Sequence, residues 1–447
     1  MRFCTLSSIA AVAAAFSFFL SVSASPSTSR QDVVQHRYDG AEMAARGVRA
    51  RETEKIKPKV FIVSMFDPEA EVWWGIPEFD LLARNISVPG FSPLFPEAHC
   101  TADGEICQLI TGEGEINAAV TLTALYTSAL FDLTTTYFLI AGIAGISPEV
   151  GTLGSVTFAR YAVQVALQYE FDAREPSLPA NWTTAYIPQG ATQPLAYPSS
   201  LYGTEVFALN PTLRDTALRL AANATLADSP AAITYRAHYA PQSSNTTANY
   251  TAASLPPGLT ACDTATSDVY WSGALLGRAF AAYTSLATNG SALYCSTQQE
   301  DNASLEALLR GARARFLDFA RVVVMRTASD FDRPYEGESA VENLLYADQG
   351  GFEPAVENIY RAGVRVVGGI VGGWEGEDGF EAGVAPGAYV GDVFGSLGGE
   401  PDFGPGSVFE DGEGDGVAER KVRRRGVVGR RHRRPGARRG VAGSLRP

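Results

Sequence analysis

The sequence predicts an α/β fold, and a glycine-rich stretch in its first third carries the argument. Gly112 and Gly114 stand where a strand would pass into a helix, because apolar residues with helical spacing follow them. Unpaired backbone N–H groups at such a junction can face an anion or a hydroxyl-rich ligand. Residues 137–140 form a short apolar run, which is typical of a parallel strand covered on both faces. Gly142 and Gly145 come next and predict a turn at the carboxyl end of that run, where α/β sheets bind their ligands. This stretch therefore predicts a small-molecule site on an α/β scaffold.

The other expected elements follow along the chain. With 447 residues, 46% of them hydrophobic, the chain can bury one large core or two modest ones. Residues 57 to about 170 form the first half of that core, starting with a strand at 59–65. A segment rich in Pro, Ser, Thr and Asn, from about 172 to 260, is predicted to be a loop-rich insertion. Apolar spacing then predicts a late strand at 321–325 and helices at 213–222, 273–284, 305–319 and 353–371.

The N-terminus has the pattern of a secretory signal peptide. Arg2 precedes an apolar run at 9–20, and the small residues Val22, Ser23 and Ala24 form a cleavage site. The run is too short for a confident membrane span. We expect cleavage after Ala24, with an uncleaved anchor as the alternative. This predicts the secretory pathway and an extracellular or cell-surface location, and the polar residues 25–56 that follow are expected to be a disordered linker.

Two further patterns agree with secretion. Four cysteines remain after the predicted cleavage, an even number that permits two disulfides in an oxidising compartment. Local pairing would join Cys100 to Cys107 and Cys262 to Cys295, but three connectivities are possible, and buried free thiols are the alternative. The chain also has seven sequons for N-glycosylation, at Asn85, Asn181, Asn223, Asn245, Asn249, Asn289 and Asn302.

The charge of −13 is unevenly distributed. Residues 418–447 hold 12 of the 36 basic residues and one acid, so the remainder has 24 basic and 48 acidic residues and a charge of about −24. Such a body repels nucleic acid. The basic tail at 407–447 has no pattern of a core element, so it is expected to be disordered. The alternative is that the gene prediction is inaccurate at its 3′ end, so that this tail is not part of the protein.

Several classes of site have no support in the sequence. The four histidines lack metal-ligand spacing, so we expect no metal. A Walker A lysine and a G-x-S-x-G elbow are also lacking, so we expect no nucleotide-driven work, no such serine nucleophile and no cofactor. With at most one candidate span, polytopic membrane insertion is not expected.

A family resemblance rests on five long segments in order: KPKVFIVSMFDPEAEVW, TGEGEINAA, IAGIAGISPEVGTLGSV, VVVMRTASDFDRP and YVGDVFGSLGGEPDFGPG. They resemble the purine nucleoside permease family of fungi and bacteria over residues 57–406. The G-x-G-x-x-x-A-A and G-x-A-G patterns also resemble the nucleoside phosphorylase and nucleosidase superfamily. The resemblance implies a single phosphorylase/nucleosidase-like domain at 57–406, with a central mixed sheet flanked by helices, plus the loop-rich insertion. Since superfamily members are often oligomers, it also implies a homo-oligomer.

The resemblance also implies roles for individual acids. The superfamily places the acid that protonates the purine in a Ser-Asp pair after a late buried strand, which matches Ser329 and Asp330; an Asp that caps the next turn is the alternative. The acid that binds the ribose hydroxyls matches Glu300, although Gln299 stands where the superfamily has Met, and a solvated acidic turn is as good an account.

The hydrolytic members place a water-activating glutamate shortly after the first strand. Asp67, Glu69 and Glu71 lie there, and Glu71 aligns best, with surface acids as the alternative. A phosphorylase would instead need basic residues around a phosphate, for which Arg84, Arg160 and Arg326 are the candidates.

Aromatic residues are the expected contacts of the base or of the pocket wall. Phe66 follows the first strand, and the resemblance extends to Asp268, Tyr270 and Trp271, for which a role in the core is the alternative. Together these features predict a protein that recognises purine nucleosides and hydrolyses the N-ribosidic bond in support of nucleoside uptake. The alternatives are a non-catalytic nucleoside-binding component of transmembrane transport and a phosphate-dependent phosphorylase.

Overall fold

The computed structural model describes residues 54–172, 174–175, 178–240 and 249–404. The predicted signal peptide, the predicted linker as far as residue 53 and the predicted basic tail lie outside these ranges.

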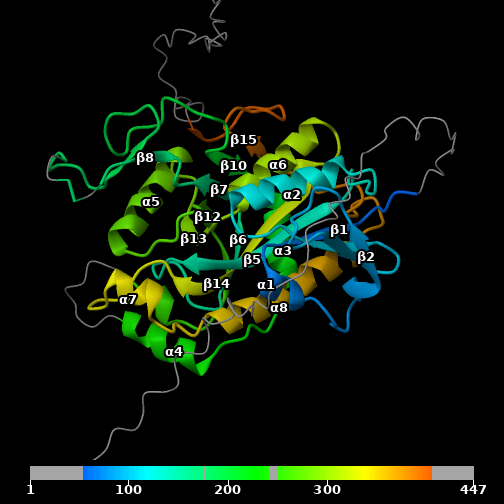
Figure 1. Cartoon of the computed structure of the whole chain (residues 1–447), viewed down its shortest axis with the longest axis horizontal. Helices are drawn as coiled ribbons and strands as arrows, with labels where there is room; N and C mark the ends of the chain where they lie inside the picture. The colour runs from blue at the N-terminus through cyan, green and yellow to red at the C-terminus, as the bar shows by residue number, and fades with distance from the viewer. Residues whose placement is uncertain (1–53, 173, 176–177, 241–248, 405–447) are drawn as a thin grey trace, which may run out of the picture. The chain divides into compact units, whose positions relative to one another are not determined.

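Four parallel strands form the centre of the sheet (Figure 1). β1 (Val60–Ser64) lies between β4 (Ile106–Ile110) and β5 (Tyr137–Ile146). β14 (Val322–Phe331) runs beside β5 over almost its whole length. Nearly every residue of these strands is buried, which explains why their sequences are continuous apolar runs.

The remaining strands extend this centre in both directions, with parallel and antiparallel neighbours. One flank ends in an antiparallel pair beyond β4, namely β3 (Glu97–Cys100) and β2 (Arg84–Ser87). The other flank continues from β5 through β13 (Tyr294–Gln298), β12 (Asp263–Thr266), β7 (Tyr161–Gln164), β10 (Val206–Ala208) and β15 (Gly391–Asp392). β6 (Val156–Ala159) pairs with β14, and β11 (Leu259–Ala261) pairs with β6. β8 (Gln168–Glu170) and β9 (Tyr186–Pro188) form a separate two-stranded sheet.

Helices cover both faces of the sheet, so the predicted class, an α/β fold with a central mixed sheet flanked by helices, is confirmed (Figure 1). On one face, α2 (Glu115–Thr127) and α6 (Asp301–Arg313) share a core cluster with Phe61 and Val63 of β1. Alternate residues of the same strand join a second cluster with α8 (Phe352–Gly372) and α3 (Pro211–Ala221). This alternation follows from the twofold side-chain period of a strand.

The other helices lie in the connections between these elements. They are α1 (Asp67–Glu71), α4 (Pro230–Arg236), α5 (Ala274–Ala287), α7 (Ala340–Leu345) and four 3₁₀ turns at Leu81–Ala83, Ala237–Tyr239, Ala252–Ser254 and Phe319–Arg321. Residues 172–260, which the sequence predicts to be a loop-rich insertion, contain β9, β10, α3 and α4. Of these, β10 joins the main sheet and α3 packs into the core beside α8.

Two central strands are longer than the sequence predicts. β5 continues through Gly142 and Gly145, so these glycines lie inside a strand rather than in a turn after it, and neither has a positive φ. In the same way β14 continues through Ser329 and Asp330. The two strands extend each other because their backbone hydrogen bonds run in parallel register nearly to the end of both.

Both predicted local disulfides are present, which settles the connectivity. Cys100–Cys107 joins β3 to β4, and Cys262 at the start of β12 pairs with Cys295 in β13. The second bond lies in the part of the sheet that leads directly into residues 297–300.

We expect the two disulfides to differ in their contribution to stability. The Cys262–Cys295 disulfide closes a loop of 33 residues and thereby lowers the entropy of the unfolded chain. Its removal in Cys262→Ser with Cys295→Ser should therefore lower the free energy of unfolding by about 3–4 kcal/mol. The Cys100–Cys107 disulfide closes a loop of only seven residues, so Cys100→Ser with Cys107→Ser should lower the free energy of unfolding by about 2 kcal/mol. Urea unfolding of the two double variants measures the difference, and equal losses would contradict the loop-length account.

One predicted glycosylation site is ruled out in the folded protein. Asn302 is buried in α6, its amide nitrogen donates to the Thr204 carbonyl at 2.7 Å, and its oxygen accepts from the Thr266 hydroxyl at 2.7 Å. An oligosaccharide on this nitrogen would have no room. Asn245 lies outside the described residues, and glycosylation at the exposed sequons stays a prediction.

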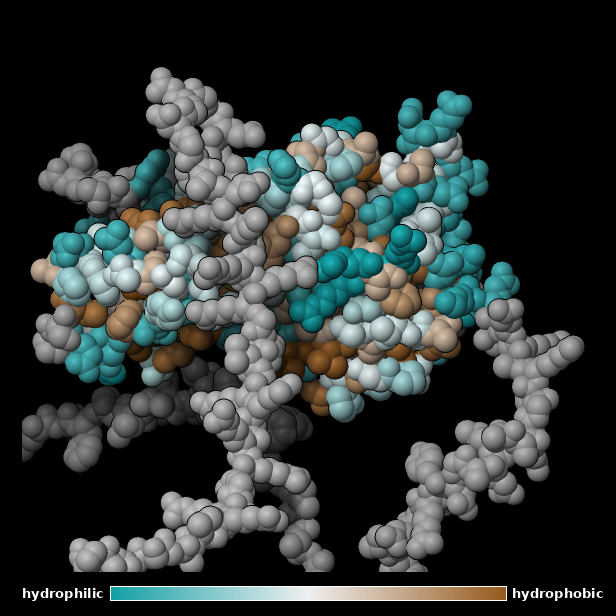
Figure 2. Space-filling model, turned by 90° about the horizontal axis from the view of Figure 1, so that it is seen from above, coloured by the Kyte–Doolittle hydropathy of each residue, from teal (hydrophilic) through white to brown (hydrophobic). Residues whose placement is uncertain are grey.

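The surface mixes hydrophilic and hydrophobic residues over the face that Figure 2 presents. Within the described ranges, no helix is both long and apolar enough to span a bilayer.

Candidate functional site

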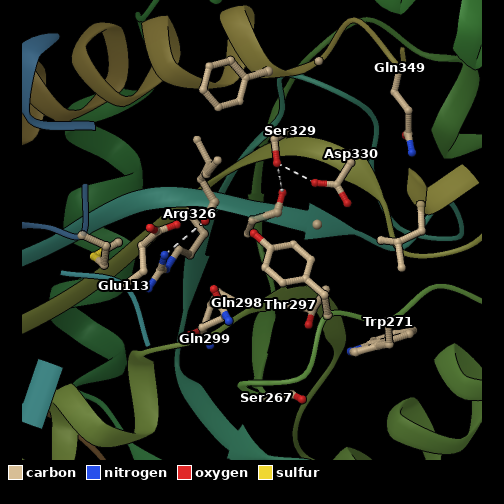
Figure 3. A pocket seen from close by; sticks show the side chains of 18 of the residues that line it. Glu113, Ser267, Trp271, Thr297, Gln298, Gln299, Arg326, Ser329, Asp330 and Gln349 are labelled. Atoms are coloured by element: carbon tan, nitrogen blue, oxygen red, sulfur yellow. Dashed lines mark hydrogen bonds between the residues drawn. The ribbon is translucent and has the colours of Figure 1, made fainter. Parts of the chain in front are cut away.

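A cavity of about 510 Å³ opens at the carboxyl ends of β1, β5 and β14 (Figure 3). Its volume is in the range of small-molecule sites in proteins. The wall is formed by residues from seven parts of the chain: 65–69, Glu113, 143–145, 267–271, 297–300, 326–330 in β14, and 343–352. The sequence predicted the end of the sheet at which this pocket lies.

Glu69 is a buried carboxyl group in the pocket wall. It lies in α1, which begins with Asp67 and Pro68 directly after β1, a favourable start for a helix. Its two oxygens accept the backbone N–H groups of Met65 at 2.8 Å and Ile143 at 2.7 Å. Burial raises the pKa of Glu69 to about 8, although Arg326 and the two N–H donors act in the opposite direction.

Glu71, the residue that the sequence selected for water activation, lies elsewhere. It is exposed and does not line the pocket. Glu69 and Glu71 are two residues apart in one helix, so they point about 200° apart. The position in the pocket wall therefore belongs to Glu69, and we correct the candidate base from Glu71 to Glu69.

Gly142 provides the space that the buried groups occupy. A Cβ atom at this position would lie 2.5 Å from Glu69 Oε1 and 2.8 Å from Arg326 Nη1. Gly145 has a similar role, because a Cβ there would lie 3.3 Å from Asp330 Oδ2. These positions require glycine because a side chain would collide with the neighbouring groups, not because of the turn that the sequence predicted.

Glu300 lies at the N-terminus of α6, where the helix dipole favours a negative charge. It is 4% exposed, and its Oε1 accepts the backbone N–H of Gly114 at 3.0 Å. Gly112 and Gly114 have φ values of +83° and +87°, a conformation that favours glycine and turns the loop before α2 towards Glu300. Burial raises the pKa of Glu300, while Arg326 lowers it. The N–H group that the sequence assigned to a ligand is thus used by Glu300.

Arg326 is the only cation among the described residues that line the cavity. It extends from β14, is 2% exposed, and donates to Asp301 through Nη2 at 2.6 Å and Nε at 3.3 Å. Glu300 Oε2 is 3.4 Å away, and the Ile143 carbonyl accepts from Nη1 at 3.1 Å. Its charge is therefore already matched by acids of the protein.

Ser329 and Asp330 lie at the other side of the pocket, near the end of β14 (Figure 3). The Ser329 hydroxyl is 2.6 Å from Asp330 Oδ1 and 3.2 Å from the Ala144 carbonyl. Burial raises the pKa of Asp330 above its usual value, and the hydrogen bond from Ser329 lowers it to a smaller extent. Such a carboxyl group retains its proton more readily than a solvated one.

The predicted aromatic contacts are only partly brought together. Phe66, Tyr270 and Trp271 line the pocket, and Tyr270 is 70% exposed at its mouth. Trp271 also packs edge-on against Phe280, at 4.9 Å between ring centroids. Asp268 is exposed and does not line the pocket; its Oδ1 accepts the backbone N–H of Glu115 at 3.0 Å, at the start of α2.

Two of the three arginines considered for a phosphate lie outside the pocket wall. Arg160 pairs with Asp402 at 2.6 Å, and Arg84 belongs to β2 at the edge of the sheet. Within the ranges described, no cluster of three or more His, Cys, Asp or Glu residues is placed to hold a metal ion.

Sequence reasoning missed the segment 343–352 entirely. It connects α7 to α8 and closes the pocket beside Asp330, where Gln349 Oε1 accepts the backbone N–H of Phe331 at 2.7 Å. Sequence reasoning also gave no role to Asp301, which is fully buried, and it preferred Glu71 to Glu69 among the acids after the first strand. For Glu69 a pattern was available, because the helical spacing from Met65 predicts which of the neighbouring acids faces inward.

Comparisons with known proteins give consistent names. The family model for purine nucleoside permease (NUP) matches residues 57–385. A purine nucleoside permease of Candida albicans is 45% identical over 353 residues, which cover 78% of this chain and 83% of the relative. A probable purine nucleoside permease of Schizosaccharomyces pombe is 42% identical over 324 residues, which cover 71% of this chain and 90% of the relative.

Solved structures were also matched, at low similarity. One is a 5′-methylthioadenosine/S-adenosylhomocysteine nucleosidase from Neisseria meningitidis, with a TM-score of 0.38, 15% identity and coverage of 70% of this chain and 98% of that one. Another is the futalosine hydrolase of Helicobacter pylori, with a TM-score of 0.40, 13% identity and coverage of 69% and 97%.

Proposed function

This chain belongs to the purine nucleoside permease family, and we propose that it binds purine nucleosides in the cavity and hydrolyses their N-ribosidic bond. The observation that carries the proposal is a pair of carboxyl groups with raised pKa, Glu69 and Asp330, which line one cavity together with the buried Glu300. Perturbed acids that converge on a pocket of this size are typical of catalytic sites.

Binding uses the two sides of the cavity for different parts of the ligand. Glu300 offers a carboxylate for the vicinal ribose hydroxyls, which donate charge-assisted hydrogen bonds. The base then lies towards Ser329 and Asp330, with the rings of Tyr270 and Trp271 nearby. A purine presents a ring nitrogen and a flat apolar face, which suit an acid and aromatic rings.

In the reaction, the glycosidic bond between C1′ of the sugar and N9 of the purine breaks, and its electron pair leaves with the base. Asp330 donates its proton to N7 of the purine, so the base departs neutral. A carboxyl group whose pKa is raised by burial is suited to this role, because burial favours its protonated form over the charged one.

A water molecule supplies the new bond at C1′. Glu69 accepts one proton from this water while the oxygen attacks, which gives ribose and leaves Glu69 protonated. The negative charge of Glu300 favours the positive charge that develops on the sugar in the transition state. Proton exchange with solvent returns Glu69 and Asp330 to their starting states.

The charges of the pocket favour water over phosphate as the attacking group. Glu113, Glu300 and Asp348 line the cavity with Glu69 and Asp330, whereas the guanidinium of Arg326 is bonded to Asp301. A phosphate dianion would meet acids there, and no cation among the described residues of the wall is left free to bind it. This disfavours the phosphorylase alternative.

The names of the relatives favour a second candidate function. They are called permeases, which supports a part in nucleoside transport for this chain also. A chain that only bound the nucleoside and passed it to a transport system would use the same pocket without the reaction. Hydrolysis and support of uptake are compatible, since base release also removes the nucleoside outside the cell.

Base release from inosine, adenosine and guanosine separates these candidates. We expect the purified protein lacking residues 1–24 to release free base at a rate that added phosphate does not raise, with ribose rather than ribose 1-phosphate as the sugar product. Chromatography of the products gives both quantities. Tight binding without release would favour the transport component, and release that depends on phosphate would favour the phosphorylase.

A further inference from the structure

Two neighbouring acids at the start of α6 approach one arginine at unequal distances. Asp301 is fully buried and its Oδ1 lies 2.6 Å from Arg326 Nη2, whereas Glu300 Oε2 lies 3.4 Å from the same nitrogen. Nε of Arg326 also donates to Asp301, at 3.3 Å. Asp301 thus takes a two-point contact with the guanidinium, and Glu300 has only a long one.

The backbone that carries both acids is fixed by a single side chain. Gln298 Oε1 accepts the N–H groups of Glu300 at 2.7 Å and of Asp301 at 2.8 Å. The amide nitrogen of Gln298 in turn donates to the hydroxyls of Thr264 and Thr266 in β12. Neither acid can move towards or away from Arg326 by a shift of the main chain without breaking these bonds.

The consequence for Glu300 follows from what a buried guanidinium requires. Arg326 stays charged at any ordinary pH, and its N–H groups need acceptors because they are removed from water. Without the Asp301 carboxylate, the nearest negative acceptor is Glu300 Oε2. Rotation of the Glu300 side chain into a close pair with Arg326 would engage Oε2, the oxygen that now makes only a long contact with the guanidinium.

We propose that Asp301 is a positioning residue that occupies Arg326, and thereby leaves the Glu300 carboxylate free for the sugar hydroxyls of the substrate. The proposal rests on the proposed function of Glu300, and it assigns to Asp301 the preference for ribonucleosides over 2′-deoxyribonucleosides. A 2′-hydroxyl strengthens binding only if a carboxylate oxygen is available to accept its hydrogen bond.

Replacement of Asp301 by Asn tests this directly, because it keeps the shape and removes the charge. For the wild type we expect kcat/KM for inosine to exceed that for 2′-deoxyinosine by about tenfold or more, as one charge-assisted hydrogen bond implies. For Asp301→Asn, we expect this ratio to fall to within about twofold of one, mainly through a higher KM for inosine. Asp228→Asn is the matched control, since Asp228 makes a two-point contact with Arg236 outside the pocket, and its ratio should not change.

A second variant separates positioning from loss of stability. Arg326→Gln added to Asp301→Asn removes the cation that would capture Glu300, so the preference for inosine should return at least in part. If Asp301 only stabilised the fold, Asp301→Asn would lower kcat/KM equally for inosine and 2′-deoxyinosine. The double variant would then recover none of the preference for inosine. An unchanged ratio in Asp301→Asn would overturn the proposal and leave the hydrolase intact.

The same comparison works without turnover. If the wild type releases no base, the proposed hydrolysis fails, and the ratio of dissociation constants for inosine and 2′-deoxyinosine, measured by calorimetry, replaces that of kcat/KM. A ratio that collapses in Asp301→Asn then still supports the positioning role. Equal affinity of the wild type for both nucleosides would overturn it.

Discussion

Asp330→Asn is expected to lower kcat for base release from inosine by about 10²–10⁴-fold, the usual contribution of a general acid. An amide has the size of the carboxyl group but cannot deliver a proton to the purine. The base would then have to leave as an anion, which is the most costly part of the reaction. Because binding does not depend on that proton, KM should change much less than kcat.

The surroundings of Asp330 explain why this one acid is suited to the task. Its side chain is held between the Ser329 hydroxyl and the space left by Gly145, close to the end of β14. Burial raises its pKa, so more of it is protonated near neutral pH than of a solvated aspartate. Asp348 lines the same pocket, but its side chain is exposed to solvent.

A substrate with an activated leaving group provides the sharpest control. The leaving group of p-nitrophenyl riboside, p-nitrophenolate, departs without protonation. Asp330→Asn should therefore cleave this substrate at a rate within about tenfold of the wild type, a much smaller loss than the loss on inosine. Asp348→Asn makes the same Asp-to-Asn change at an exposed position of the pocket wall and should change inosine cleavage by less than about threefold. Equal losses on inosine and on p-nitrophenyl riboside would show that Asp330 does not act as the acid.

The fold class was predictable because its determinants are local in the sequence. A buried parallel strand is a continuous apolar run, and Gly112 and Gly114 mark the turn into α2. The length of β5 was not predictable, since Gly142 and Gly145 resemble a turn when only neighbours in sequence are considered. Their role depends on β14, Glu69 and Asp330, which lie far away along the chain.

The same distinction applies to the site. Ser329, Asp330 and Glu300 could be selected because motifs carry them, and all three line the cavity. The charge balance of the pocket could not be predicted, because it depends on the contact between Asp301 and Arg326, which are 25 residues apart in the sequence and lie in different elements. Choosing Glu71 over Glu69 was an error of alignment by position, where the period of the helix decides which acid is buried.

Glu69→Gln is expected to reduce kcat/KM by about 10²–10⁴-fold at pH 8, because the amide cannot accept a proton from the attacking water. The pH dependence identifies the group more specifically. Since the pKa of Glu69 is about 8, the carboxylate that acts as the base is a minority species below that pH. Cleavage of p-nitrophenyl riboside, which needs no acid, should therefore fall about tenfold per pH unit below pH 8 and level off above it.

Glu71→Gln is the matched control, because it makes the same change two residues along the same helix on an exposed side chain. It should leave both the rate and the pH profile as in the wild type. In Glu69→Gln the residual rate should lose the rise towards pH 8, which a mere loss of folded protein could not cause, because that would scale the rate equally at every pH. Thermal melting of both variants measures any cost of placing the Gln amide opposite the N–H of Met65 or Ile143. A profile that keeps its rise in Glu69→Gln and loses it in Glu71→Gln would return the role of the base to Glu71.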